Sequence, residues 1–375
     1  MSTVAVGQRV DVLAGVRSRA WIVGWWAAGR AIVLATAAAM HLLGPRALAG
    51  DDERRSTFGV LASWDGRWYR TVAQNGYLLE PGRQSDPAFF PLYPALLRAL
   101  HGLGLGYDTA GLLVSQIGFL AAIVALHALT RELLGARLAR RTAIYLALFP
   151  VGFVFSMAYP ESIVLCAIAL TALAALRGRW IAAAVLAAVG TLARPETLFV
   201  ALPLLPIAFR EPRGTRRGIA LGATAAPFAA LGAFALYLQL TLHDSLAWTH
   251  AERAWGRRFT PLGVVRAFAD LPRAVHGNAW VIRDLVFFLL YLGLLEVARR
   301  RGAPLGWTVA GALVVVLPTF SGSFHSVARF GLLAPALYWG LAALGEHRPR
   351  TDRAIRIASA VLLAAGTVSL AYVFP

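Results

Sequence analysis

The sequence contains no lysine, a single cysteine and few charged residues. All 36 basic residues are therefore arginine, and Asp, Glu, Lys and Arg together make up 15% of the chain. Cys166 lies within an apolar run and has no second cysteine to pair with, so an internal disulfide is excluded. The chain also lacks a phosphate-loop lysine motif, a dinucleotide-binding glycine fingerprint, a serine-nucleophile elbow and coiled-coil heptads. These absences leave no sign that the protein uses ATP or a nucleotide-sugar.

What the chain has instead is long apolar runs. Hydrophobic residues make up 58% of its 375 positions, which is more than in an ordinary soluble domain. The formal net charge of +17 could suggest a nucleic-acid partner, but the arginines stand between apolar runs. That arrangement is the positive-inside pattern of membrane proteins rather than a binding face for nucleic acid. The sequence therefore predicts an all-α polytopic membrane protein that has the lipid bilayer, and no nucleic acid, as a partner.

Apolar runs and arginine bias predict a single domain over residues 1–375 with about 11 transmembrane helices. Residues before Trp21 carry Arg9, Arg17 and Arg19, which places the N-terminus in the cytoplasm, and the first apolar run shows no cleavage site and is expected to be retained. A long first outer loop is expected at about 44–108, a second at about 243–284, and the C-terminus outside. The expected spans are 21–43, 109–133, 142–155, 163–176, 180–192, 197–208, 218–242, 285–297, 307–317, 330–344 and 357–373.

The turns assigned to the outer face hold most of the unusual polar residues. Because the assignment used only arginine bias, their meeting on one face points to an extracytoplasmic site. The second outer loop also carries arginines against the inside rule, which suggests binding of phosphate or anionic lipid. The polar residues are Asp65, Asp86, Glu161, Arg194, Glu196, His243, Asp244, His325 and Arg329, and the arginines are Arg253, Arg257, Arg258, Arg266 and Arg273.

The segment Trp64-Asp65-Gly66-Arg67-Trp68-Tyr69 is read as the start of a short interfacial helix that ends at Asn75-Gly76. Its aromatic side would face the membrane and its charged side would face water. Asp65 could then act as a general base that takes a proton from an acceptor hydroxyl. The alternative is an interfacial carboxylate paired with Arg67 or Arg70.

The other candidates also have two interpretations each. Asp86 could bind substrate hydroxyls, or it could initiate an Asp-Pro turn. Glu161 and Arg194 lie beside prolines at the ends of short spans, where charges are costly, and they could serve a site or pair with each other. Arg329 ends a Ser/Gly-rich turn that could cradle a phosphate, or could simply be an anchor in a flexible loop. The histidines show no metal-ligand spacing, so no metal site is expected.

Several motifs resemble the PIG-V family, the second mannosyltransferase of glycosylphosphatidylinositol anchor assembly, together with its bacterial homologues. The first is Trp64-Asp65-Gly66-Arg67-Trp68-Tyr69, followed by Ala73, Gly76-Tyr77 and Ala88-Phe89-Phe90-Pro91-Leu92-Tyr93-Pro94. Phe155-Ser156-Met157-Ala158-Tyr159-Pro160-Glu161-Ser162, Leu192-Ala193-Arg194-Pro195 and the turn 321–329 follow in the family's order. The family often has histidine where Trp68 stands, serine where Pro160 stands and threonine where Ala193 stands.

The resemblance implies an integral-membrane glycosyltransferase of the GT-C type that transfers mannose from polyprenyl-phosphate-mannose to a glycolipid, lipid-linked glycan or protein acceptor. Asp65 matches the catalytic carboxylate in the first outer loop of such enzymes. Arginines would stabilise the departing phosphate, so no cofactor is implied. Arg- and Ala-rich usage is typical of a GC-rich bacterium, which would place the enzyme in the plasma membrane with its site outside. The rival hypothesis is a transporter or lipid flippase. Residues expected to bind donor or acceptor are Trp64, Trp68, Tyr69, Asp86, Tyr93, Tyr159, Glu161, Arg194, His325 and Arg329.

Overall fold

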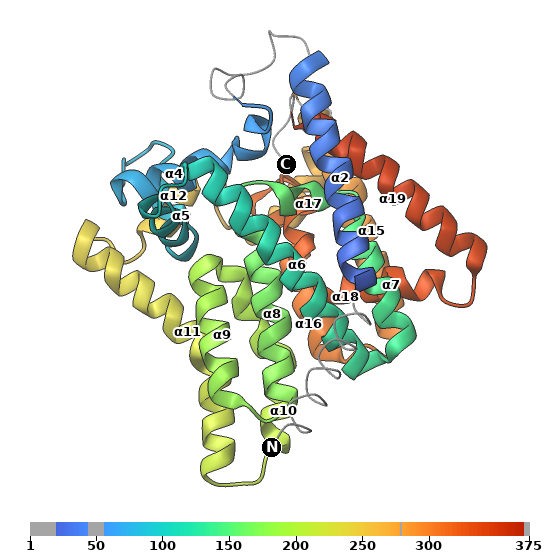
Figure 1. Cartoon of the computed structure of the whole chain (residues 1–375). Helices are drawn as coiled ribbons and strands as arrows, with labels where there is room; N and C mark the ends of the chain where they lie inside the picture. Colours follow the sequence, from blue (N-terminus) through green and yellow to red (C-terminus); the bar gives the residue numbers. More distant parts are fainter. Residues whose placement is uncertain (1–19, 44–55, 278–279, 371–375) are drawn as a thin grey trace, which may run out of the picture.

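The computed structural model describes residues 20–43, 56–277 and 280–370, and within these ranges every regular element is a helix (Figure 1). Three of these helices are long and apolar enough to cross a membrane: α2 (Ala20–Leu43), α6 (Tyr107–Leu134) and α11 (Thr215–Leu242). A fourth span is possible if the segments Val327–Leu333 and Pro335–Gly345, which meet at a bend of 88°, count as one. The chain is therefore a helical membrane protein, as expected. The count of about 11 spans stays a prediction, because the other helices are too short or too polar to establish it.

The remaining expected spans also coincide with helices, but prolines divide them. Pro150, Pro160 and Pro195 stand at the breaks around α7, α8 and α9, where a proline cannot continue the backbone hydrogen bonding. The expected span 142–155 is α-helical only to Ala147, and after a break at Pro150 it continues as a short 3-10 helix, Gly152–Ser156. The further helices are α4 (Asp65–Asn75), α5 (Leu92–Gly102), α7 (Ala136–Ala147), α8 (Glu161–Leu176), α9 (Trp180–Ala193), α10 (Ala201–Arg210), α12 (Ala247–Ala254), α13 (Gly263–Ala269), α14 (Leu271–Gly277), α15 (Val281–Arg300), α16 (Leu305–Val316), α17 (Val327–Phe330), α18 (Pro335–Gly345) and α19 (Pro349–Ser369).

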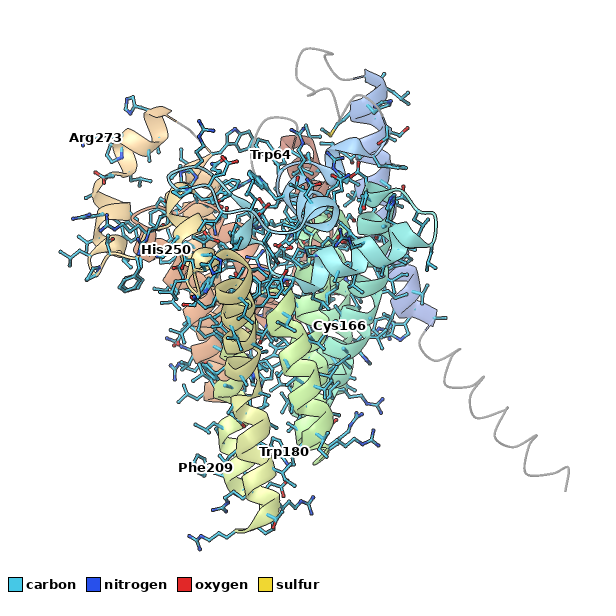
Figure 2. All side chains as sticks on the ribbon, turned by 90° about the vertical axis from the view of Figure 1, so that its left-hand side faces the viewer. Trp64, Cys166, Trp180, Phe209, His250 and Arg273 are labelled. Carbon is cyan, nitrogen blue, oxygen red and sulfur yellow. The ribbon has the colours of Figure 1, made fainter. Side chains whose placement is uncertain are left out.

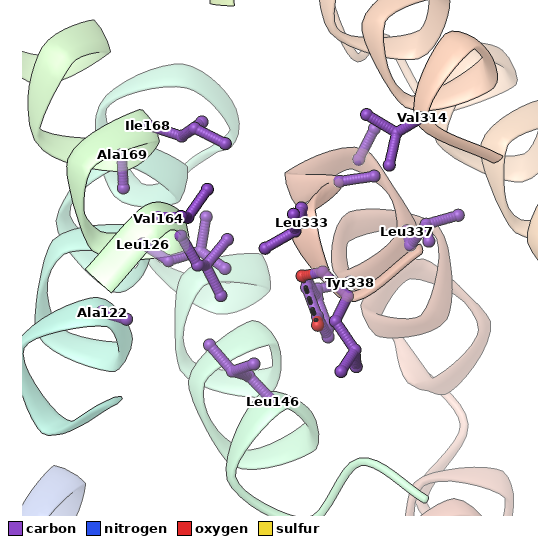
Figure 3. Close-up of a cluster of buried hydrophobic side chains, with 14 of the residues drawn as sticks. Ala122, Leu126, Leu146, Val164, Ile168, Ala169, Val314, Leu333, Leu337 and Tyr338 are labelled. Atoms are coloured by element: carbon purple, nitrogen blue, oxygen red, sulfur yellow. Dashed lines mark hydrogen bonds between the residues drawn. The ribbon is translucent and has the colours of Figure 1, made fainter. Parts of the chain in front are cut away.

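The core lies where α6, α7 and α8 meet the bent segment that ends in α18 (Figure 3). Leu126, Leu146 and Val164 are fully buried there against Leu333 and Leu337. Small residues allow the closest helix contacts. A Cβ atom on Gly340 of α18 would lie 2.0 Å from the carbonyl oxygen of Leu294 on α15, so these two backbones touch directly.

The two long loops lie at the same end of the helix bundle. Figure 2 shows Trp64 of the first outer loop at that end, together with His250 and Arg273 of the second. Trp180 and Phe209, which adjoin the basic turns 177–179 and 210–217, lie at the opposite end. The structure therefore separates these two basic turns from the two long loops, as the arginine bias predicted. The side of the membrane that each end faces stays a prediction.

The expected short helix in the first outer loop is confirmed as α4, which runs from Asp65 to Asn75. Gly76 follows with a φ of 81°, a left-handed conformation that suits glycine at a helix end. The orientation expected for Asp65 was wrong, because its side chain is buried rather than turned toward water. The predictions for the N-terminal arginines, for residues 44–55 of the loop and for the C-terminus fall outside the described residues.

Candidate functional site

Asp65 forms a buried ion pair with Arg329, near the other end of the sequence. The Nη1 atom of Arg329 donates a hydrogen bond of 2.6 Å to Oδ2 of Asp65. The two residues are only 6% and 3% exposed. The expected partners of Asp65 were Arg67 or Arg70, but Arg70 pairs with Asp108 at 3.1 Å instead. The carboxylate is thus held inside the protein by a cation from the late Ser/Gly-rich turn.

This pair is the first link of a longer chain of charges. Nε of Arg329 lies 3.4 Å from Oε1 of Glu161, and that oxygen accepts a 2.6 Å hydrogen bond from Nη1 of Arg194. Arg194 also donates to both carboxylate oxygens of Glu196, over 3.1 and 2.7 Å. Glu161 and Arg194 thus pair with each other, which was one of the two interpretations that the sequence left open. We call these five residues, Asp65, Arg329, Glu161, Arg194 and Glu196, the ion-pair chain.

Burying the five charges of the ion-pair chain costs free energy that their mutual attraction must offset. Removing ions from water costs several kcal/mol each, so buried charges persist only with well-placed partners. Three carboxylates alternate with two guanidiniums, so every charge has an opposite neighbour and one negative charge is left over. Charges buried at this cost are typical of functional sites.

Strained backbone marks both segments that form the first pair. Trp64 has a φ of 56° and Ser326 has a φ of 65°, and neither residue is a glycine. Trp64 immediately precedes Asp65 in α4, and Ser326 immediately precedes α17, which carries Arg329. The hydroxyl oxygen of Tyr159 accepts the backbone N–H of Asp65 at 3.0 Å and so fixes the start of α4. Such conformations cluster at functional sites, where the surrounding structure holds them.

The turn that ends in Arg329, for which the sequence left a phosphate cradle or a simple anchor open, is bound to the carboxylate of Asp284. Asp284 at the start of α15 accepts the backbone N–H groups of Ser326 and Ala328, at 3.3 and 3.2 Å. The Tyr291 hydroxyl donates to the Ala328 carbonyl oxygen at 2.7 Å. Two backbone donors of the turn are thus already used by a carboxylate. The sequence analysis missed Asp284, whose only signal is an acidic residue in the first turn of an apolar helix.

Aromatic residues of α4 and α5 pack beside the ion-pair chain. The Tyr69 ring lies 5.1 Å from the rings of both Phe89 and Tyr93. Trp68 stacks on Phe89 at 5.7 Å and meets Trp255 of the second outer loop edge-on at 5.3 Å. Tyr69 and Tyr93 are buried, and Tyr93 donates to the Gly111 carbonyl oxygen, so both support the site from within. Trp64 and Trp68 are partly exposed and can reach a ligand.

Among the described residues, neither Asp86 nor His325 contacts a member of the ion-pair chain. Oδ1 of Asp86 accepts a hydrogen bond of 2.7 Å from the backbone N–H of Leu78. The backbone carbonyl oxygen of Asp86 accepts a second one from the backbone N–H of Phe89. These are the contacts of a turn initiator, and burial raises the pKa of the Asp86 carboxyl. His325 is exposed, and its backbone N–H lies 3.4 Å from the Ser323 hydroxyl.

Three guanidiniums surround the ring of Phe330. The central carbon atoms of Arg194, Arg257 and Arg329 lie 5.2, 4.8 and 5.5 Å from the ring centroid, which is within the range of cation–π attraction. Arg257 follows α12, so the second outer loop reaches the ion-pair chain. One of the arginines that break the inside rule therefore lies at the site.

Besides Arg194 and Arg329 of the ion-pair chain, a third buried arginine, Arg30 of α2, supports the site. Arg30 is 3% exposed, and its Nη1 donates to the Ser156 hydroxyl at 2.6 Å and to the Gly152 carbonyl oxygen at 3.1 Å. Its guanidinium also lies 4.4 Å from the centroid of the Phe119 ring. The turn that it holds, Gly152–Ser156, leads directly to Tyr159 and Glu161. The sequence analysis missed this arginine because it stands alone in an apolar helix.

No group of three or more His, Cys, Asp or Glu side chains among the described residues is placed to hold a metal ion. The carboxylates of the ion-pair chain face guanidiniums instead. A cavity of about 370 Å³ lies between α4 and α5 on one side and α9 and α11 on the other. Its lining is mostly apolar and includes Val72, Pro94, Leu192 and Phe234, with Arg98 as the charged member.

No protein family profile and no curated protein sequence matches the chain. Several solved structures share a distant likeness. The archaeal oligosaccharyltransferase AglB from Archaeoglobus fulgidus, in complex with an inhibitory peptide and a dolichol-phosphate, is 16% identical with a TM-score of 0.42, over 91% of this chain and 54% of that chain. The A. fulgidus oligosaccharyltransferase with zinc and sulfate is 14% identical with a TM-score of 0.47, over 89% of this chain and 53% of that chain. Its apo form is 15% identical with the same TM-score, over 94% and 55%. The chain thus spans about half the length of these proteins, and no functional argument rests on a likeness of this size.

Proposed function

We propose that the protein is a GT-C-type mannosyltransferase of the bacterial plasma membrane. It transfers mannose from polyprenyl-phosphate-mannose to a hydroxyl of a glycolipid, lipid-linked glycan or protein, on the extracytoplasmic face and with inversion. One observation carries the proposal. Each of the four motif segments that resemble the PIG-V family contributes one charged residue, Asp65, Glu161, Arg194 or Arg329, to a single buried network.

Asp65 is the general base of this reaction. Its Oδ2 is held by Arg329, and Oδ1 receives no hydrogen bond from the residues that the structure describes, so that oxygen can face the acceptor. Oδ1 takes the proton of the acceptor hydroxyl while the hydroxyl oxygen bonds to the anomeric carbon. The bond from that carbon to the phosphate oxygen breaks at the same time, and its electron pair leaves with the polyprenyl phosphate. Attack from the face opposite the leaving group inverts the anomeric centre.

Arg329 and Arg194 act in this proposal mainly as fixed positive charge. Both guanidiniums already donate to carboxylates, so they orient Asp65 and Glu161 and offset charge that develops on the leaving group. Trp64 and Trp68 border the position of the sugar, because aromatic rings pack well on the apolar faces of sugars. The cavity beside α4 and α5 takes the prenyl chain of the donor, since its lining is mainly apolar.

The test is transfer of label from radiolabelled polyprenyl-phosphate-mannose in membranes that contain the native chain, Asp65→Asn or Glu80→Gln at matched abundance. Glu80 is a control carboxylate in the same loop, and it forms only a surface pair with Arg83 at 3.7 Å. We expect labelled product from the native chain and from Glu80→Gln, and none from Asp65→Asn. Equal transfer by Asp65→Asn would remove Asp65 from the chemistry.

The same membranes also test the rival hypothesis of a transporter or lipid flippase. A transporter or flippase would show no transfer but would move a labelled lipid between leaflets. It would also depend on a charge inside a span more than on Asp65, and Arg30 of α2 is such a charge. Lipid movement that Arg30→Gln abolishes and Asp65→Asn leaves intact would favour transport over transfer.

A further inference from the structure

A phosphate group needs hydrogen-bond donors that are not already used, and most of the donors around the ion-pair chain are engaged. Arg329 contacts Asp65 and Glu161, and Arg194 contacts Glu161 and Glu196. The backbone donors at the start of α17 bind Asp284. The ion-pair chain itself carries one excess negative charge, which would repel a phosphate unless another cation stood beside it.

Arg257 is that additional cation, and its contacts are loose. Nε lies 3.5 Å from Oε2 of Glu252, and Nη2 lies 3.4 Å from the Ser326 hydroxyl. Charge-assisted hydrogen bonds of full strength are shorter, at about 2.7–2.9 Å. The Arg257 side chain is 30% exposed, whereas those of Arg194 and Arg329 are 10% and 3% exposed. Among these three arginines around Phe330, Arg257 can therefore exchange its present contacts for a ligand at the lowest cost.

We propose that Arg257, together with the hydroxyl of Ser326, binds the phosphate of the lipid-linked donor. This assignment rests on the proposed function and identifies the residues that the donor phosphate contacts. The donor is a phosphodiester with one negative charge, and it leaves as a phosphate monoester with a charge approaching two. Arg257 therefore binds the leaving group more strongly than the intact donor, which lowers the barrier to transfer.

The position of Arg257 fits this role. The guanidiniums of Arg257 and Arg329 both lie against the Phe330 ring, and Arg329 forms the ion pair with Asp65, the proposed base. Ser326 precedes Arg329 by one helical turn, so one short segment carries a donor to the phosphate and the cation that orients Asp65. Base and leaving group would then lie on either side of one anomeric carbon, as inversion requires.

The experiment measures binding of polyprenyl phosphate, without a sugar, to the purified full-length protein in lipid nanodiscs. The variants are Arg257→Gln, Arg257→Lys and Asp65→Asn, and Arg258→Gln is the matched control. Arg258 is the next residue, is exposed, and loses the same charge. We expect Arg257→Gln to weaken binding about tenfold to a hundredfold, as for a lost hydrogen bond to a charged group. Arg257→Lys should restore part of it, and Arg258→Gln should bind as the native chain does. Asp65→Asn removes one negative charge from the ion-pair chain and should bind polyprenyl phosphate at least as tightly as the native chain.

Binding of inorganic phosphate distinguishes a lipid-linked phosphate from a free phosphate as the ligand of Arg257. Arg257-dependent binding of inorganic phosphate with the same affinity as polyprenyl phosphate would overturn a lipid-linked ligand. Weak binding of inorganic phosphate, together with tight Arg257-dependent binding of the lipid phosphate, supports it. In transfer assays, Arg257→Gln should raise the KM for donor and leave the KM for acceptor unchanged.

The two proposals can fail separately. If the native chain binds and uses the lipid-phosphate donor while Arg257→Gln binds it equally well, the assignment of Arg257 is overturned and the proposed function stands. If the native chain neither binds polyprenyl phosphate nor transfers sugar, both are overturned. An equal loss of binding in Arg257→Gln and Arg258→Gln would show a general charge effect and overturn the specific role. Unfolding midpoints of all variants separate lost binding from lost folding, and Arg257→Lys tests the role if Arg257→Gln unfolds.

Discussion

The guanidinium of Arg329 pairs with the carboxylate of Asp65 across 264 positions of the sequence, with both side chains buried. Arg329→Gln would leave Asp65 buried without its main partner, and we expect a loss of about 3–5 kcal/mol in the free energy of unfolding. The double variant Asp65→Asn/Arg329→Gln should recover part of this loss, because no unpaired carboxylate remains. Unfolding in a mild detergent with increasing denaturant measures all four members of the cycle.

The pair between Arg70 and Asp108 serves as the control. These side chains are 25% and 46% exposed, so solvent screens their attraction. We expect Arg70→Gln to cost at most about 1 kcal/mol. Costs for Asp65→Asn and Arg329→Gln that simply add in the double variant would contradict the coupling inferred from the 2.6 Å contact.

Two glycines of α2 make a matched pair for testing helix packing. A Cβ atom on Gly29 would lie 2.1 Å from the Ala147 carbonyl oxygen of α7, whereas one on Gly24 would meet nothing within 4 Å. We expect Gly29→Ala to lower the free energy of unfolding by about 1–3 kcal/mol through overpacking. Gly24→Ala should be neutral or slightly stabilising, because alanine favours a helix. Equal thermal unfolding midpoints for the two variants would show that α2 and α7 do not approach this closely.

Ser326 offers a test of backbone strain beside the site. Its φ of 65° is left-handed, a conformation that glycine adopts at little cost. We therefore expect Ser326→Gly to be more stable than Ser326→Ala by about 1 kcal/mol, since both variants lack the hydroxyl and only the alanine retains the strain. Ser323 in the same turn has no positive φ, and there the alanine variant should be at least as stable as the glycine variant. The free energies of unfolding of the four variants, measured with increasing denaturant, test this prediction.

Glu252 predicts a pH dependence of donor binding. Burial raises the pKa of its carboxyl, although the nearby Arg257 and Arg194 lower it and the carboxylates of Glu196 and Asp65 raise it. As the pH falls through this raised pKa, Glu252 takes up a proton and releases Arg257. Binding of the phosphodiester donor, whose single charge does not change in this window, should therefore tighten as the pH falls through the raised pKa of Glu252.

The protonation of Glu252 also sets the direction in which the stability of the fold changes with pH. The folded protein holds the Glu252 proton at a higher pH than the unfolded chain does, so the contribution of this residue to stability falls as the pH rises through that window. Glu252→Gln should flatten the pH dependence of binding while it leaves the effect of Arg257→Gln in place. Binding that weakens on acidification in the native chain would contradict the prediction.

Local signals predicted the local parts of this structure well. The helix from Asp65 and its stop at Gly76 follow from side-chain spacing and glycine, and the apolar runs gave helices at the expected places. The separation of the two basic turns from the two long loops followed from arginine bias alone. The number of spans did not follow, because prolines divide several runs into helices shorter than a bilayer.

The partners of the charged residues could not be predicted from neighbouring sequence. Asp65 lies near Arg67 and Arg70, yet it pairs with Arg329, because only the folded bundle brings α4 and α17 together. Asp284 and Arg30 gave almost no signal, since each lies in an apolar helix and binds backbone or side-chain groups of segments that are distant in the sequence. The polar residues of the outer turns were found as a group because they share one end of the molecule, and their pairing required the structure.

The ion-pair chain also has a consequence for how the protein is made. Asp65 and Glu161 leave the ribosome well before Arg329, so during insertion both carboxylates wait for a partner that is synthesised near the end. The segment that carries Arg329 therefore completes the ion-pair chain, and a nascent chain that has not yet reached Arg329 holds two acidic groups without this cation.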